Sequence, residues 1–162
     1  DFLGSVAGEE FYNGKTDRGF PTALACMKLL DSTGVSLVGK KIVVLGQGDL
    51  VGRPVAQLVK ARGLQPIPVT RKTENKEQIL KEADVIISGI GHGKHVVGDM
   101  VKEGVILIDA GTSEGHGGIV GDVDLESVKD VASFVSPVPG GVGPVTVAML
   151  IKNVLEVAKK LR

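Results

Sequence analysis

Short apolar runs alternate with segments of helical periodicity along this chain. The runs are rich in Val and Ile and largely uninterrupted by polar residues, which is typical of parallel strands buried on both faces. Strands are therefore expected at Ile42–Leu45, Gln65–Val69, Asp84–Ser88, Val105–Asp109 and Ser133–Val135. Helices are expected at Pro21–Leu30, Val51–Lys60, Glu74–Ala83 and Val145–Leu161. This alternation predicts an α/β fold with a doubly wound parallel sheet of the Rossmann kind, joined by right-handed crossovers.

The chain of 162 residues has the length of one domain. Residues 1–20 are small, polar and interrupted by Gly, so we expect them to form a linker that leads into a domain spanning residues 21–162. The chain begins at Asp1 rather than Met, and we expect it to be part of a longer protein. The last helix carries a helical stripe of apolar residues at positions 147, 148, 151, 154, 155, 158 and 161.

Composition narrows the class of partners. Lys plus Arg and Asp plus Glu number 19 each, so no net charge attracts the chain to nucleic acid or to an anionic membrane. No apolar run approaches the roughly 20 residues that span a bilayer. Cys26 is the single cysteine and is expected to be a small core residue in a reducing compartment, the cytoplasm.

A glycine-rich turn follows the first buried strand and opens a helix. In this position glycines allow a tight turn and close approach of the backbone to a pyrophosphate, which the helix N-terminus attracts. The candidate residues for cofactor binding here are Gly46, Gln47, Gly48, Val51 and Gly52. The third glycine falls one residue later than in the commonest spacing, and an ordinary glycine-rich turn is the alternative.

The second strand ends in a basic loop rather than in an acidic residue. An acidic side chain at this point accepts hydrogen bonds from the ribose of NAD, whereas cations and hydroxyls suit the 2′-phosphate of NADP. Thr70, Arg71 and Lys72 are therefore candidate contacts to NADP, with Arg71 the main one. NAD is the less favoured cofactor, and a solvated basic turn is the alternative.

Further loops follow the third and fourth strands, where ligands of open α/β sheets bind. Small residues there would let a nicotinamide ring lie against the backbone, and the candidates are Ser88, Gly89, Gly91, Gly111, Thr112 and Ser113. The stretch 137–144 combines three prolines with three glycines, which favours a shaped binding loop over a plain connector. His92, His95 and His116 lie in Gly-rich loops without a cluster of further ligands, so no metal site is expected.

Several of these segments resemble the methylenetetrahydrofolate dehydrogenase/cyclohydrolases. Residues 137–150 (PVPGGVGPVTVAML) resemble the family's PVPGGVGPMT signature, and 121–124 resemble its GDV segment. Residues 51–54 resemble the family's VG-x-P, and 109–111 its D-x-G. The resemblance implies an NADP-binding domain that serves hydride transfer from 5,10-methylenetetrahydrofolate to NADP in one-carbon metabolism. It also implies substrate contacts from Pro139, Gly140, Gly141, Val142 and Gly143.

The chain departs from the family pattern at several positions. Gln47 stands where the family has Arg, Arg71 where it has Ser, and Leu3 where it has a folate-contacting Asp. The family's Y-x-x-x-K catalytic motif belongs to an amino-terminal domain and is not matched, so no catalytic residue is expected here. Tetrahydrofolate would bind through that missing domain, and the chain alone would complete neither the dehydrogenase nor the cyclohydrolase reaction.

A homodimer is also expected, since glycine-turn folds of this type often pair through an edge strand. Two alternatives stay open. One is a non-catalytic nucleotide-binding or dimerisation module, which Leu3 and Gln47 favour. The other is an unrelated NADP-dependent reductase of the shikimate-dehydrogenase kind, which shares the basic loop but not the proline–glycine stretch.

Overall fold

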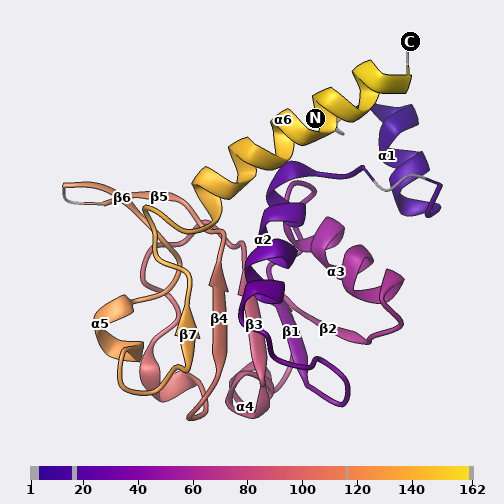
Figure 1. Cartoon of the computed structure of the whole chain (residues 1–162). Coiled ribbons are helices and arrows are strands. Elements are labelled where there is room, and N and C mark those ends of the chain that lie inside the picture. Colours follow the sequence, from indigo (N-terminus) through magenta and orange to yellow (C-terminus); the bar gives the residue numbers. More distant parts are fainter. Residues whose placement is uncertain (1–3, 16–17, 116, 161–162) are drawn as a thin grey trace.

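The centre of the molecule is a parallel sheet of five strands in the order β2-β1-β3-β4-β7 (Figure 1). The computed structural model describes residues 4–15, 18–115 and 117–160. The strands are β1 (Ile42–Leu45), β2 (Pro66–Val69), β3 (Val85–Ser88), β4 (Ile106–Asp109) and β7 (Phe134–Val135). The chain moves from β1 to β2 on one side and then returns to β3 on the other. The predicted doubly wound parallel sheet is therefore confirmed, with its switch point between β1 and β3.

Helices cover both faces of the sheet because alternate strand residues point to opposite sides. On one face Ile42 and Val44 pack in a cluster with residues of α2 (Pro21–Ser32) and α3 (Gly52–Ala61). On the other face Val43 and Leu45 join a cluster with Leu80 and Val128. Those two residues belong to α4 (Lys76–Glu82) and α5 (Leu125–Val128), and a 3₁₀ helix, η1 (Gly98–Met100), precedes β4.

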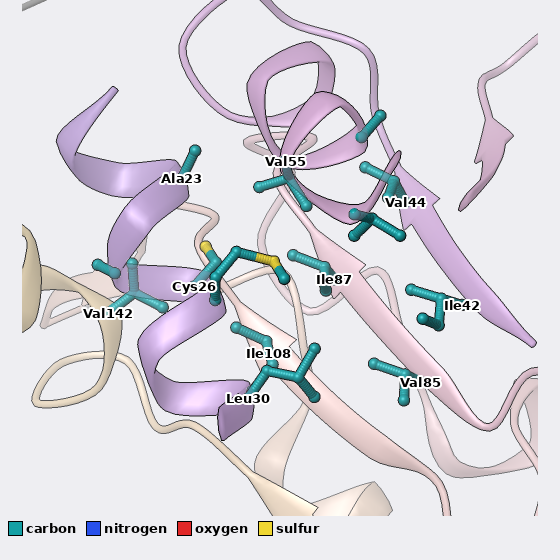
Figure 2. Packing of buried hydrophobic residues seen from close by; sticks show 14 of the residues in the cluster. Ala23, Cys26, Leu30, Ile42, Val44, Val55, Val85, Ile87, Ile108 and Val142 are labelled. Atoms are coloured by element: carbon teal, nitrogen blue, oxygen red, sulfur yellow. The ribbon is translucent and has the colours of Figure 1, made fainter. Parts of the chain in front are cut away.

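Cys26 lies in the first of these clusters. Its side chain is fully buried, and Figure 2 shows it on the side of α2 that faces Ile87 and Ile108. Burial raises the pKa of the thiol to about 12. The prediction of a core cysteine is confirmed, and the thiol has none of the thiolate character that a nucleophile needs.

The last helix, α6 (Val142–Lys160), has one packed side and one exposed apolar side. It packs along α2 and extends well past the sheet (Figure 1). The stripe identified in the sequence is not the packed side, because Val147, Ile151, Val154 and Leu155 are each more than half exposed. The helix begins three residues before the expected Val145, within the proline–glycine stretch.

Four short elements besides η1 were not expected from the sequence. The segment 1–20 contains a helix, α1 (Ser5–Tyr12), whose Phe11 is buried with its ring centroid 5.3 Å from that of Phe20. A hairpin of β5 (Ser113–Gly115) and β6 (Gly118–Val120) projects beyond the carboxyl edge of the sheet (Figure 1), and α5 follows it. Within the described ranges, no helix has the length and apolarity to cross a membrane.

Candidate nucleotide-binding site

The loops singled out in the sequence begin at one edge of the sheet. The strand register pairs Leu45 with both Val69 and Ser88, and Ser88 with Asp109. The four strands therefore end side by side, and the loops that follow them share the carboxyl edge. Two cavities open there, of about 670 Å³ and 450 Å³, which is the size of sites for small molecules and cofactors.

The first cavity is the more polar of the two, and the side chains of Arg71 and Lys76 make it basic. It brings together six of the predicted cofactor residues, namely Gly46, Gln47, Gly48, Thr70, Arg71 and Gly89. Leu45, Lys76, Ile90, His92 and His95 complete its lining. The sequence thus predicted that the first two loops converge, although they lie more than 20 residues apart.

The glycine turn is shaped by close backbone contacts. Gly46 has φ +90°, and a Cβ there would lie 2.8 Å from the carbonyl oxygen of Gly89. A Cβ at Gly52 would overlap the carbonyl of Gly46, whereas Gly48 faces open space. Gln47 donates through Nε2 to the carbonyl oxygen of Gly46 at 2.8 Å. The outer two glycines are therefore required by the turn, and Gly48 leaves the cavity open at the start of α3.

The basic loop after β2 is held by its own threonines. Thr73 Oγ1 accepts a hydrogen bond from the backbone N–H of Thr70 at 2.9 Å, and Thr70 Oγ1 accepts one from Lys72 at 3.2 Å. Arg71 lines the cavity and has no carboxylate partner among the described residues. Lys72 is exposed and does not line the cavity, whereas Lys76 of α4 does. Lys76 is a cation that sequence reasoning missed, because a lysine at the start of a polar helix gives no signal of its own.

The second cavity is mainly apolar. It is lined by the five predicted substrate residues, Pro139 to Gly143, and by Val51, Gly111 and Thr112 from the predicted cofactor set. Thr22, Leu50, Asp109, Ala110, Ile119, Pro137, Val138, Pro144 and Thr146 also line it. The peptide bond between Val138 and Pro139 is cis, and Gly140 has φ +106°. Val51 lies between the cavities, where its side chain contacts the Cα side of Gly89.

A pair of buried carboxylates lies beneath these loops, and the sequence reasoning did not single them out as site residues. Asp122 accepts hydrogen bonds from Ser88 Oγ at 2.7 Å and from the N–H groups of Ile90 at 2.8 Å and His92 at 2.9 Å. Asp109 accepts from the N–H groups of Gly111, Asp122 and Val123. Burial raises the pKa of Asp109 to about 6, against the lowering effect of these donors.

The remaining predicted cofactor residues line neither cavity. They are Gly52, Lys72, Ser88, Gly91 and Ser113. Gly52 serves the turn, and the hydroxyl of Ser88 is occupied by Asp122. Ser113 Oγ is buried without a hydrogen-bond partner in the described part of the chain.

Two histidines to which the sequence analysis gave no role line the first cavity. The rings of His92 and His95 lie edge to face, 5.3 Å apart, at the first cavity. The described residues include no cluster of three or more His, Cys, Asp or Glu that could hold a metal ion. His116 and Leu3, which also entered the sequence interpretation, lie outside the described residues.

Comparison with known proteins decides the family. Residues 21–162 match the family model described as tetrahydrofolate dehydrogenase/cyclohydrolase, NAD(P)-binding domain. The chain belongs to this family. The alternative of an unrelated reductase is therefore wrong, and the resemblance of the proline–glycine stretch is confirmed.

Relatives in this tetrahydrofolate dehydrogenase/cyclohydrolase family are longer than the chain. The chain is 49% identical over 138 residues to the bifunctional protein FolD of Caldanaerobacter subterraneus, and the match covers 85% of this chain and 49% of that protein. The crystal structure of FolD from Campylobacter jejuni has a TM-score of 0.91 and 38% identity, and it covers 100% of this chain and 58% of that one. The Trypanosoma brucei FolD, solved with NADP cofactor and an inhibitor, has a TM-score of 0.88 and 36% identity and covers 99% and 58%. The chain thus spans about half the length of the curated relatives it matches.

Proposed function

We propose that this chain is the NADP-binding part of a methylenetetrahydrofolate dehydrogenase/cyclohydrolase. The observation that carries the proposal is that Arg71 and the turn Gly46–Gly48 line one cavity at the switch point of the sheet. Arg71 has no carboxylate partner among the described residues, so its guanidinium is available for a 2′-phosphate. The Trypanosoma brucei relative, which is 36% identical, was solved with NADP.

The two cavities are proposed to hold different parts of the bound ligands. In the first, Gly48 and the start of α3 would receive the pyrophosphate, and Thr70, Arg71 and Lys76 would surround the adenosine ribose and its 2′-phosphate. The passage past Gly89 and Val51 would place the nicotinamide towards Gly111 and Thr112. The loop 139–143 would then form the floor of the folate side in the second, apolar cavity.

The chemistry proposed for the complete protein is hydride transfer from 5,10-methylenetetrahydrofolate. Bound NADP supplies the hydride acceptor, and the residues of this chain orient it. Since expulsion of the hydride by the substrate nitrogen needs no strong base, positioning by the loops carries most of this step. Hydrolysis of the resulting methenyl group needs residues from the remainder of the protein, and the chain alone is proposed to complete neither reaction.

The exposed apolar side of α6 is proposed to be covered by that remainder. Val147, Ile151, Val154 and Leu155 lie three or four residues apart on one side of the helix and are exposed. A row of this kind is typical of an interaction surface rather than of a solvated face. Its partner is proposed to be the other part of the protein, because the relatives are about twice as long as this chain.

Two further parts of the proposal concern the assembly of the complete protein and its location. The complete protein is proposed to be a homodimer in the cytoplasm, where the free thiol of Cys26 stays reduced. The edges of the sheet offer little for pairing, since β7 has two residues and β2 carries Pro66 and Pro68. Sedimentation of the complete protein tests the dimer.

Calorimetric titration of the chain with NADP and with NAD tests the cofactor proposal. We expect NADP to bind more tightly than NAD, and Arg71→Ala to weaken NADP by about tenfold or more while leaving NAD almost unchanged. Lys60→Ala is the matched control, because it removes a positive charge from an exposed position in the last turn of α3. Equal or tighter binding of NAD by the unaltered chain would contradict the 2′-phosphate assignment. Binding of neither nucleotide would contradict a nucleotide site within this chain.

A further inference from the structure

The cavity walls owe their shape to a carboxylate that no nucleotide would touch. We propose that Asp122 is a positioning residue: it holds the backbone of residues 90–92 as one wall of the first cavity, and Asp109 holds Asp122 in place. This inference rests on the proposed nucleotide binding and names a residue through which that binding is organised.

Both carboxylate oxygens of Asp122 are used by the loop that follows β3. Oδ2 accepts from Ser88 Oγ at 2.7 Å and from the N–H of Ile90 at 2.8 Å, and Oδ1 accepts from the N–H of His92 at 2.9 Å. Ile90 and His92 both line the first cavity, whereas Asp122 lies behind them and is fully buried. The carboxylate therefore acts on the cavity only through the backbone that it holds.

Asp109 fixes the segment that carries Asp122. Its Oδ1 accepts from the N–H of Asp122 at 3.1 Å, and its Oδ2 accepts from the N–H of Val123 at 2.8 Å. Oδ1 also accepts from the N–H of Gly111 at 2.9 Å, in the loop that lines the second cavity. The two carboxylates thus tie the loops after β3 and β4 to one another, across the boundary of the two cavities.

Further contacts confine the same loop from the side of the hairpin. The N–H of Lys94 donates to the carbonyl of Gly121 at 2.9 Å, and that of Val96 donates to the carbonyl of Asp122 at 2.9 Å. Gly93 lies so close to the hairpin that a Cβ there would stand 2.7 Å from Ser113 Oγ. Residues 90–96 are therefore held along most of their length.

The fact that the buried groups are carboxylates indicates that they position the loops rather than merely fill the interior. Neither Asp109 nor Asp122 has a cationic partner among the described residues, and burying an unpaired carboxylate is costly. An apolar core would stabilise the fold without that cost. What a carboxylate supplies is several acceptor sites for N–H groups, which fixes a loop before the ligand arrives and lowers the entropy lost on binding.

Asp122→Asn is the test, with Asp84→Asn as the matched control. An Asn keeps the shape but places an N–H₂ group against donors, so at least one of the backbone N–H bonds is lost. Asp84 stands just before β3, at the opposite edge of the sheet, and also accepts two hydrogen bonds, from Lys41 N–H and Lys102 Nζ, each at 2.7 Å. Replacing Asp84 is expected to lower the free energy of unfolding and to leave the shape of the two cavities unchanged.

The affinities for NADP and NAD are measured by calorimetry, beside the urea unfolding of each variant. We expect Asp122→Asn to weaken both nucleotides by the same factor, about tenfold, and to leave their ratio unchanged. Asp84→Asn is expected to bind both as the unaltered chain does. Faster hydrogen exchange of the Ile90 and His92 amides without nucleotide, in Asp122→Asn only, is the accompanying signature.

Three results would overturn the inference. In the first, Asp122→Asn binds nucleotides as tightly as the unaltered chain, which leaves the proposed function standing. In the second, both variants lose affinity in proportion to their loss of stability, which makes Asp122 merely structural. In the third, the unaltered chain binds neither nucleotide, and the proposed site fails together with this inference. Should Asp122→Asn not fold, Ser88→Ala removes one donor to the same carboxylate and is expected to give a smaller equal loss for both nucleotides.

Discussion

Gly111 leaves the space that the carboxylate of Asp122 occupies, because a Cβ at position 111 would overlap that carboxylate. The relation is reciprocal: a Cβ at Gly121 would overlap the carboxylate of Asp109. Each aspartate therefore fits against a glycine that lies one or two residues from the other aspartate in sequence. The D-x-G and GDV segments, which the sequence presents as separate, form one interlocked unit.

Gly111→Ala is expected to destabilise the fold by roughly 1–3 kcal/mol, the usual cost of overpacking a filled interior. The cost arises because Asp122 must move and would release Ile90 or His92. Gly143→Ala is the control: a Cβ there meets nothing within 4 Å, and the position lies in α6. Urea unfolding measures both. Equal stability of the two variants would contradict the interlocked arrangement.

Substitutions at two glycines of the turn are expected to have different effects, one on stability and the other on nucleotide affinity. Gly52→Ala places a Cβ against the backbone of Gly46 and should lower stability by about 2 kcal/mol or more, because backbone cannot move aside cheaply. Gly48→Ala meets no atom within 4 Å, so its stability should change little, while nucleotide affinity falls because the Cβ projects where a pyrophosphate approaches. Thermal unfolding and calorimetry on the same two variants check this. Loss of stability without loss of affinity in Gly48→Ala would contradict the assignment of this glycine.

Strand positions could be predicted from the sequence because burial on both faces leaves a plain signature. Ile42–Leu45 is the clearest case, since all four residues are apolar and all four are buried. The convergence of Arg71 with the glycine turn could also be predicted, because parallel strands end at a common edge. Short elements escaped prediction: β5 and β6 have three residues each, and α1 is stabilised by the packing of Phe11 on Phe20 rather than by a periodic pattern.

The buried carboxylates could not be predicted from the sequence for a different reason. Asp109 and Asp122 lie 13 residues apart, and nothing in the local pattern of either indicates that the other receives its space. Sequence reasoning assigned Ser88 to the cofactor because of its place at a strand end, yet its hydroxyl is directed to Asp122. Lys76 was missed for the opposite reason, since a lysine at the start of a polar helix is ordinary until the fold places it at a cavity.

The exposed side of α6 should make the chain associate with itself in solution. Ile151→Gln combined with Val154→Gln is expected to lower the apparent mass at high concentration, while the free energy of unfolding changes by less than about 0.5 kcal/mol per site. Both side chains are more than half exposed, at 56% and 60%. Val38→Gln is the control, because Val38 is 81% exposed but lies in the turn between α2 and β1 rather than on α6. Sedimentation equilibrium measures the mass, and an equal effect of the control would contradict a role for this helix face.

The stability of the chain should fall as the pH rises from about 4 to above 6, through ionisation of Asp109. Burial holds the pKa of this carboxyl at about 6, above the ordinary value of 3.8. The folded state therefore binds more protons than the unfolded state between these values, and the free energy of unfolding decreases with pH there, by up to roughly 3 kcal/mol. The contribution is present below pH 3.8 and is lost once the pH exceeds the folded pKa.

Asp109→Asn isolates this effect, because the variant lacks the titrating group while other carboxyls remain. Asp84 does not interfere, because the hydrogen bond from Lys102 lowers its pKa to about 2. Its titration therefore changes the stability only below about pH 4. We expect the difference in unfolding free energy between the unaltered chain and Asp109→Asn to be larger at pH 4.5 than at pH 7.5. Urea unfolding at the two pH values measures it. The same difference at both would mean that Asp109 titrates as it does in the unfolded chain, with its donors offsetting the whole cost of burying the charge.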